Sequence, residues 1–173
     1  LKPIARGDFA TVYRARDREL GREVAIKQIH AQFLQDPSQL ERYWQEAQLL
    51  AALQHPNILT VYDIVRSQGW LVLELLRGNL QQVAQRSPME VDRLRFALLC
   101  GLNALRFLHG HGILHGDVKP SNLLVDPRGL VKLGDFGLAR RVSNEQGSVL
   151  KGTTKYMAPE LARVFDAAEK VAE

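Results

Sequence analysis

Alternating apolar and polar residues dominate the first part of the chain and predict β-strands there. Residues 11–16 and 23–29 carry β-branched or alternating apolar side chains, and residues 17–21 between them have turn chemistry. We therefore expect the first two strands to form a hairpin. Two further strands are predicted at residues 59–65 and 70–75.

Apolar residues three and four apart predict two helices. The first begins at Asp36-Pro37, with an Asp cap and a proline in the first turn, and runs to about Leu53. Its apolar face consists of Leu40, Tyr43, Ala47 and Leu50. The second helix follows an expected capping box, Ser87-Pro88-Met89-Glu90. We expect it to be mostly buried through the leucines that repeat along it, which are Leu94, Leu98, Leu102, Leu105 and Leu108.

Two short apolar strands, residues 123–125 and 130–133, are predicted beyond these helices, joined by a type I turn over residues 126–129. Strands and helices thus occupy separate stretches, which favours an α+β fold with two lobes. The change of pattern near residues 76–80 divides the chain into a sheet-rich lobe, 1–76, and a mainly helical lobe, 77–173.

Composition narrows the functional classes. The 173 residues are 46% hydrophobic and 24% charged, which is typical of a globular protein and excludes a disordered chain. The net charge of +4 is scattered, so we expect no nucleic-acid partner. No apolar run approaches the ~20 residues of a membrane span. The single Cys100 excludes an internal disulfide and, with these features, leads us to expect a cytoplasmic protein.

Several polar residues become informative only in combination. A lysine such as Lys27 at the end of a strand, or a glutamate such as Glu46 on a helix, is by itself usually an ordinary solvated charge. A helix packed on the strand would set Glu46 against Lys27 and aim the ammonium group at nucleotide phosphates.

The most informative stretch is His115-Gly116-Asp117-Val118-Lys119-Pro120-Ser121-Asn122, which combines a carboxylate, a cation and a carboxamide between an apolar helix and a short strand. Alone, its Asp and Asn could simply satisfy a turn. Asp135-Phe136-Gly137 follows the next strand. Together, one carboxylate could orient a hydroxyl nucleophile while the other holds a metal on phosphate oxygens.

From residue 4 to about residue 160, the chain resembles the protein kinase family. It contains in order a glycine-rich-loop position, Val24-Ala25-Ile26-Lys27, a helix glutamate, the loop at 115–122, Asp135-Phe136-Gly137 and Ala158-Pro159-Glu160. The resemblance implies a two-lobed kinase fold with a small antiparallel sheet and one helix in the first lobe. Since the family's catalytic domain is longer than this chain, we expect the second lobe to be incomplete.

The resemblance also assigns roles to individual residues. It makes Lys27 the lysine on the ATP phosphates, Glu46 its ion-pair partner, Asp117 the catalytic base and Lys119 a stabiliser of the transferred phosphoryl group. It makes Asn122 and Asp135 the ligands of Mg²⁺. The residues that it places around ATP are Ile4, Gly7, Val12, Ala25, Lys27, Leu73, Glu74, Leu76 and Leu124, with Glu74 to Leu76 forming a hinge whose backbone pairs with adenine.

Two departures from the family pattern stand out. Ala5 and Ala10 occupy glycine positions of the glycine-rich loop, where a methyl group narrows backbone freedom. Gly116 stands where most members have arginine, so a phosphorylated activation segment lacks its usual bidentate partner there.

The leading interpretation is an ATP- and magnesium-dependent serine/threonine protein kinase of signal transduction, with a protein Ser or Thr hydroxyl as acceptor. Lys119-Pro120-Ser121-Asn122 and residues 152–160 resemble the serine/threonine rather than the tyrosine type. Two alternatives stay open, namely a pseudokinase scaffold, and a small-molecule kinase like the aminoglycoside phosphotransferases. The oligomeric state is not indicated by the sequence.

Overall fold

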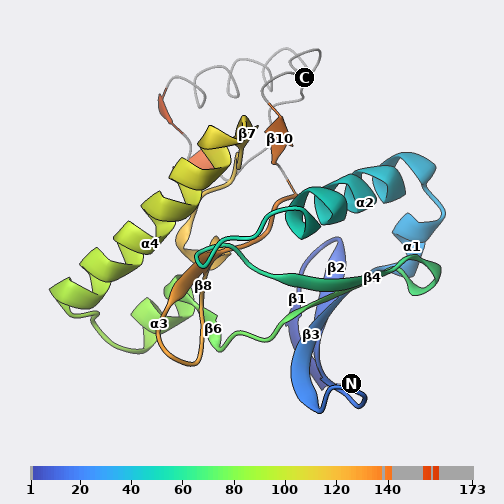
Figure 1. Ribbon diagram of the computed structural model, residues 1–173, viewed down its shortest axis with the longest axis horizontal. Helices are drawn as coiled ribbons and strands as arrows, with labels where there is room; N and C mark the ends of the chain where they lie inside the picture. The colour runs from blue at the N-terminus through green and yellow to red at the C-terminus, as the bar shows by residue number, and fades with distance from the viewer. Residues whose placement is uncertain (1, 138, 142–153, 157, 160–173) are drawn as a thin grey trace.

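The computed structural model describes residues 2–137, 139–141, 154–156, 158 and 159. Its first part is built on an antiparallel sheet of five strands in the order β1-β2-β3-β5-β4 (Figure 1). The strands are β1 Lys2–Arg6, β2 Ala10–Asp17, β3 Arg22–Ile29, β4 Val61–Val65 and β5 Trp70–Glu74. The four strands predicted in this part of the chain are confirmed.

The hairpin of β2 and β3 is regular along its whole length, from Ala10 opposite Ile29 to Asp17 opposite Arg22. Its turn is stabilised by Asp17, whose Oδ1 accepts hydrogen bonds of 3.1 Å from the backbone N–H groups of Glu19 and Leu20. Gly21 closes the turn with a φ of +66°, a value that favours glycine. The predicted hairpin is therefore confirmed together with its turn chemistry.

Helix α2, Pro37–Ala51, lies across one side of this sheet (Figure 1). Asp36 caps it as predicted, because its Oδ1 accepts a 3.0 Å hydrogen bond from the N–H of Ser38. The buried residues of its inner face are Tyr43, Trp44, Ala47 and Leu50. A short helix before it, α1 Ala31–Leu34, was not predicted, since four residues are too few to show a helical period.

The second part of the chain is organised around a long helix and short strands. Its elements are β6 Gly78–Asn79, α3 Leu80–Arg86, α4 Val91–Gly110, β7 Ile113–Leu114, β8 Leu123–Val125, β9 Val131–Leu133 and β10 Arg140–Arg141. Strands β6, β8 and β9 form one small sheet, and β10 pairs with β7. The predicted strands β8 and β9 are confirmed, and the turn between them is held by Asp126, whose Oδ1 accepts from the N–H groups of Arg128 and Leu130.

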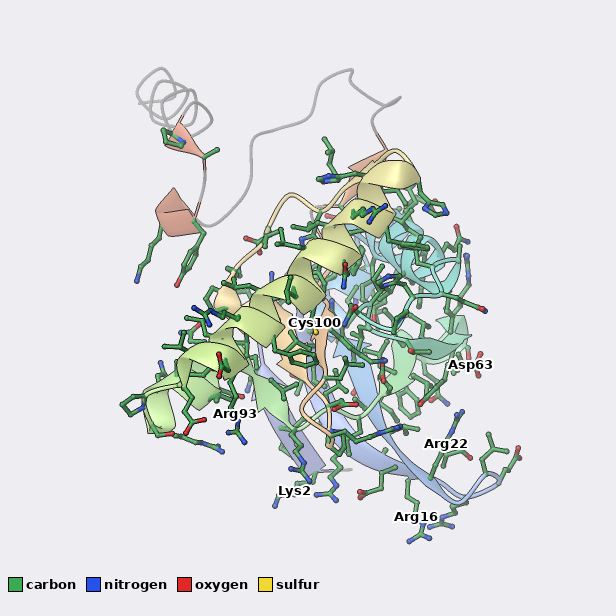
Figure 2. All side chains as sticks on the ribbon, turned by 60° about the vertical axis from the view of Figure 1, so that its left-hand side comes forward. Lys2, Arg16, Arg22, Asp63, Arg93 and Cys100 are labelled. Atoms are coloured by element: carbon green, nitrogen blue, oxygen red, sulfur yellow. The ribbon has the colours of Figure 1, made fainter. Side chains whose placement is uncertain are left out.

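Helix α4 corrects two expectations. Glu90 is its N-cap and makes no side-chain capping bond, so the capping box expected at residues 87–90 is wrong. A capping box exists instead at α3, between Asn79 and Gln82. The buried residues of α4 are Ala97, Cys100, Ala104 and Leu108, and Figure 2 marks Cys100 on this helix.

The leucines expected inside α4 are mostly on its outside. Leu94, Leu98 and Leu102 are 45%, 53% and 60% exposed, whereas Leu108 is fully buried. The helix contacts β7 and β9, and the residues that it buries include small ones such as Ala104. The stripe that includes Leu98 then points away from the strands, and the prediction of a mostly buried helix is wrong.

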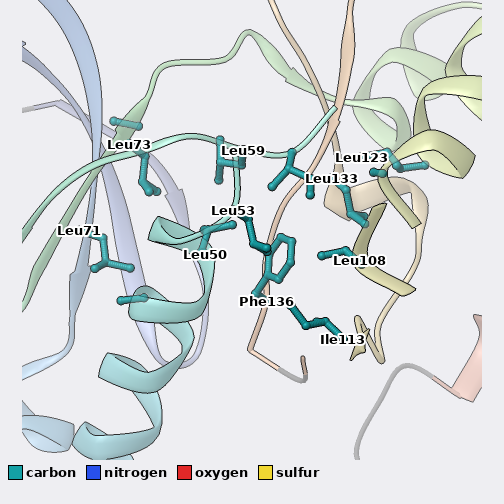
Figure 3. Packing of buried hydrophobic residues seen from close by; sticks show 14 of the residues in the cluster. Leu50, Leu53, Leu59, Leu71, Leu73, Leu108, Ile113, Leu123, Leu133 and Phe136 are labelled. Atoms are coloured by element: carbon teal, nitrogen blue, oxygen red, sulfur yellow. The ribbon is translucent and has the colours of Figure 1, made fainter. Parts of the chain in front are cut away.

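One continuous apolar core joins the two parts. It runs from Leu71 and Leu73 of the sheet through Leu50 of α2 to Phe136 and then Leu108 of α4 (Figure 3). Since these residues come from segments far apart in sequence, the core orients the two parts relative to each other.

A backbone link reinforces this contact. The segment before β4 pairs with β9, with the Leu133 N–H donating to the Asn57 carbonyl at 2.8 Å and the Leu59 N–H donating to the Leu133 carbonyl at 2.9 Å. The buried Asn57 amide also donates to the Val131 carbonyl at 2.9 Å. These bonds fix β9, and with it the position of the residues that follow, Gly134 to Phe136.

None of the helices in the described part of the chain combines the length and the hydropathy of a membrane span.

Candidate active site

The loop of residues 115–122 brings three of the predicted site residues into contact. Asn122 is buried in a 3₁₀ turn, Pro120–Asn122, and its Nδ2 donates to the Asp117 carbonyl at 2.8 Å and to the Asp117 Oδ2 at 3.1 Å. The Lys119 Nζ lies 2.6 Å from the same carboxylate oxygen. The Asp117 carboxylate is thereby positioned by both an amide and a cation.

His115 anchors this loop to the segment after β9. Its ring is buried, the Nε2 donates to the Gly134 carbonyl at 3.1 Å, and the Nδ1 accepts from the Asp117 N–H at 3.3 Å. Burial lowers the pKa of His115, against the opposing effects of the Gly134 carbonyl and nearby carboxylates. The imidazole is therefore a neutral connector. The sequence alone assigns His115 no role, although the apolar Ile113-Leu114 before it indicates burial.

Asp135 and Phe136 point in opposite directions. Phe136 is buried, with its ring 4.8 Å from that of His115 in an edge-on contact. Asp135 has a φ of +59°, unusual for a non-glycine residue, and its carboxylate is half exposed, 3.5 Å from the Lys27 Nζ. This backbone turn presents the carboxylate outward while the next side chain anchors the segment.

Because Gly134 has no side chain, Leu124 and Leu59 can pack closely against the backbone before Asp135. A Cβ at this position would lie 2.8 Å from the Leu124 Cδ1 and 3.3 Å from the Leu59 Cδ2. A larger residue would therefore have to displace Leu124, which is one of the predicted adenine contacts.

Lys27 lies on β3 next to α2. The Tyr43 hydroxyl donates to its backbone carbonyl at 2.9 Å and ties the helix to the strand. Glu46 lies on α2 three residues after Tyr43, but its side chain is outside the described part of the structure. The predicted ion pair between Lys27 and Glu46 therefore stays a prediction.

The register of the sheet gathers four of the predicted nucleotide contacts. Val12 faces Lys27 across the β2–β3 pair, and Ala25 faces Leu73 across the β3–β5 pair. Because paired residues and residues two apart share a face, all four lie on the same face of the sheet. Ala25 and Leu73 are buried there, while Ile4 on β1 is exposed.

The glycine-rich loop joins β1 to β2. Its Gly7 is exposed, and the Gly7 N–H donates to the Ala10 carbonyl at 3.0 Å. The two alanines at family glycine positions lie in strands, with Ala5 opposite Val12 and Ala10 opposite Ile29. Extended strand conformation suits alanine, so the methyl groups are accommodated without strain.

In the hinge segment, residues 74–76, the polar groups of Glu74 already have hydrogen-bond partners within the protein. The Glu74 carboxylate contacts the Lys132 Nζ at 2.7 and 2.8 Å and accepts a 2.6 Å bond from the Thr60 N–H. The Glu74 N–H donates to the Thr60 carbonyl. Among the described residues, no hydrogen-bond partner of Leu76 is found, so its backbone N–H and C=O can serve a ligand.

The oxygen atoms of Asn122 and Asp135 suit Mg²⁺, which commonly takes its remaining ligands from phosphates and water. Within the described residues there is no group of three or more His, Cys, Asp or Glu side chains that could hold a metal. Mg²⁺ is commonly bound through one or two carboxylates plus phosphates and water. The Asn122 Nδ2 donates to Asp117, and its Oδ1 lies 3.5 Å from the Ser121 hydroxyl. If Mg²⁺ bound here, this Oδ1 and the exposed Asp135 carboxylate would be its protein ligands.

Comparison with known proteins agrees with this arrangement. Residues 1–171 match the family model described as "Protein kinase domain". The chain is 39% identical over 176 residues to the serine/threonine-protein kinase PknA of Mycobacterium tuberculosis, covering 95% of this chain and 41% of PknA. It is 37% identical over 171 residues to the probable serine/threonine-protein kinase PknB of Lactococcus lactis, covering 94% of this chain and 27% of that protein. The chain thus spans less than half the length of these relatives, and it belongs to the protein kinase domain family.

Proposed function

We propose that this chain carries the catalytic site of a serine/threonine protein kinase that transfers the γ-phosphoryl group of ATP to a hydroxyl group of a protein. The observation that carries the proposal is the connected set of Asp117, Lys119 and Asn122, which His115 links to Gly134 beside Asp135. The names of the relatives, both serine/threonine-protein kinases, support the same acceptor class.

Asp117 acts as the base in this proposal. Its carboxylate receives the proton of the substrate hydroxyl as the new O–P bond forms and the bond between the γ-phosphorus and the bridging oxygen breaks, which releases ADP. Asn122 keeps the carboxylate in place at 3.1 Å. Lys119, 2.6 Å from the same oxygen, stabilises negative charge on the transferred group.

Lys27 and Asp135 form the second half of the site. Lys27 binds the phosphates of ATP and pairs with Glu46, while Asp135 and Asn122 are the residues that would hold Mg²⁺. When bound, magnesium supplies positive charge to the phosphate oxygens. The 3.5 Å contact between Lys27 and Asp135 supports a common site for these residues, because it places a phosphate-binding cation beside a metal-binding carboxylate.

The nucleotide lies, in this proposal, between the sheet and the second part of the chain. Leu76 pairs with adenine through its backbone, next to Glu74 in the hinge. The remaining contacts come from Ile4, Gly7, Val12, Ala25, Leu73 and Leu124. Residues 1–76 then form the nucleotide-binding lobe and residues 77–173 the lobe of the catalytic loop and activation segment. We propose a cytoplasmic location for the domain, where ATP is available as substrate.

The deciding experiment measures transfer of labelled phosphate from ATP to a protein substrate and, in parallel, to a panel of amino sugars, with binding of ATP and Mg²⁺ measured by calorimetry. We expect label on protein serine or threonine and none on the sugars. Asp117→Asn should retain ATP binding and lose transfer. Binding without transfer by the unmodified protein would instead indicate a pseudokinase, and labelled sugar would indicate a small-molecule kinase.

A further inference from the structure

His30, the residue between β3 and α1, makes three hydrogen-bond contacts with residues 8–11, at and just after the loop between β1 and β2. Its backbone N–H donates to the Phe9 carbonyl at 3.0 Å. Its ring Nδ1 lies 3.0 Å from the Asp8 carbonyl, and its Nε2 lies 2.9 Å from the Thr11 hydroxyl. One side chain and its own backbone therefore hold residues on both sides of the loop tip.

The partners determine the tautomer of the ring. A carbonyl oxygen can only accept, so the Nδ1 must carry the proton that is donated to Asp8. With the proton on Nδ1, the Nε2 can accept from the Thr11 hydroxyl, which is buried. This tautomer satisfies both contacts at once.

Aromatic packing reinforces the hydrogen bonds. The Phe9 ring at the loop tip lies 4.4 Å from the ring of Phe33 on α1 and 5.9 Å from that of Tyr43 on α2. His30 is the N-cap residue of α1, so it connects the hydrogen-bonded side of the loop to the aromatic side. The loop is consequently attached to α1 and to α2, and Tyr43 of α2 also bonds to the Lys27 carbonyl.

We propose that His30 is a positioning residue that holds the loop of residues 7–11 in the conformation that receives the phosphates of ATP. This inference rests on the proposed function, since it names a residue that prepares the nucleotide site. Ala10 is paired regularly in β2, whereas Ala5 lies at an irregularity in the pairing of β1 with β2. The loop tip between them is restrained by its contacts with His30 and Phe33. A loop held in its binding conformation loses less conformational freedom when ATP binds.

The test compares three single variants, one double variant and one control in binding and steady-state assays with ATP and MgCl₂. His30→Ala removes both hydrogen bonds of the ring and its contact with the Phe33 ring. It should weaken ATP binding and raise KM for ATP about five- to tenfold, the effect of one to two hydrogen bonds, with kcat changed less than about twofold. His30→Asn keeps an amide donor near the Nδ1 position, and Thr11→Val removes the hydroxyl. Both should have smaller effects, and their double variant should be no worse than the stronger single one. His109→Ala, an exposed histidine on α4, is the matched control and should have no effect.

The results distinguish failure of the positioning role of His30 from failure of the proposed kinase function. Unchanged KM and binding in His30→Ala, with kinase activity intact, would overturn the positioning role and leave the proposed function standing. A fall in kcat and thermal stability with unchanged KM would make His30 merely structural and would also overturn it. If His30→Ala does not fold, His30→Asn and Thr11→Val decide the question by the same criteria. Failure of the unmodified protein to bind ATP would overturn both proposals.

Discussion

The loop of residues 115–122 and the loop of residues 7–11 border the same candidate site but are held in different ways. In the first, residues of the motif bind one another, as Asn122 and Lys119 bind Asp117. The second has one internal backbone bond, from Gly7 to Ala10. Its other contacts come from His30, Phe33 and Tyr43, which lie outside the glycine-rich motif.

This difference follows from what each loop has to do. A base and its neighbours need fixed relative positions, and short-range bonds between residues two and five positions apart provide them. A loop that covers phosphates contributes backbone groups, so its position depends on the structure that packs around it. A family motif therefore identifies the chemical groups well and the positioning of the loop less well.

The largest effect should come from Asp135→Asn, which tests the residues that carry out the chemistry rather than those that position a loop. Removing the charge that would hold Mg²⁺ is expected to lower phosphoryl transfer by about a thousandfold or more, consistent with several kcal/mol of lost transition-state stabilisation. The fold should persist, because the side chain is half exposed. Transfer assays and thermal unfolding of the same preparation check both statements, and near-normal turnover would exclude Asp135 as a metal ligand.

His115→Phe should weaken the anchoring of the 115–122 loop. It leaves the Asp117 N–H and the Gly134 carbonyl without their partner, at a cost of about 1–3 kcal/mol of unfolding free energy. Denaturant titrations of the variant and the unmodified protein give this difference directly.

The same variant tests the pH dependence. Because burial lowers the pKa of His115 below its ordinary 6.5, the unfolded chain binds the proton first as pH falls. The contribution of His115 is thus fully present above pH 6.5 and declines as the pH falls towards the lowered folded pKa. His55, whose pKa burial also lowers, remains in both proteins. The stability gap between them should narrow from pH 7 to pH 5.5; a gap independent of pH would show that His115 is not a buried neutral group.

Ala10→Gly restores a family glycine and tests whether the loop of residues 7–11 is restrained by residues outside it. Ala10 is buried in β2, so the variant should lose about 1 kcal/mol of stability through greater freedom of the unfolded chain. Since His30 and Phe33 restrain the loop tip, KM for ATP should change less than about twofold. Ala5→Gly, at an exposed strand position, is the milder control. A markedly lower KM in Ala10→Gly would show that the alanine itself limits nucleotide binding.

The smallest effect is expected from Ser148→Ala in the activation segment. Ser148 lies outside the described residues, and the argument rests on Gly116, which offers no cation where most of the family has arginine. Kinase activity should change less than threefold, or under ~0.7 kcal/mol. A tenfold loss, with the activity of the Ser148 form sensitive to phosphatase, would mean that another cation receives a phosphate there.

Much of the local structure could be predicted from the sequence. The hairpin of β2 and β3, the cap at Asp36 and the turn at Asp126 all depend on residues close together in the chain, and all are confirmed. The order of the motifs likewise sufficed for the family, because it consists of residue types at short spacings.

Other features depended on partners distant in sequence. Glu74 and Lys132 are 58 positions apart, and no local pattern marks them as a pair. The three contacts of His30 are of the same kind, since they cross from the end of β3 to a loop about twenty residues earlier, 22 in the case of Asp8.

Helix α4 shows the physical limit most clearly. Its sequence determined that it is a helix with apolar stripes, but Ala97 and Leu98 are separated by only about 100° round its axis. The tertiary structure decided which stripe is buried, because β7 and β9 lie against the side of Ala97, Cys100 and Ala104, where small side chains allow close packing, and leave Leu98 and Leu102 exposed. Helical periodicity shows which apolar stripes a helix has. The shape of the neighbouring elements determines which of these stripes they cover.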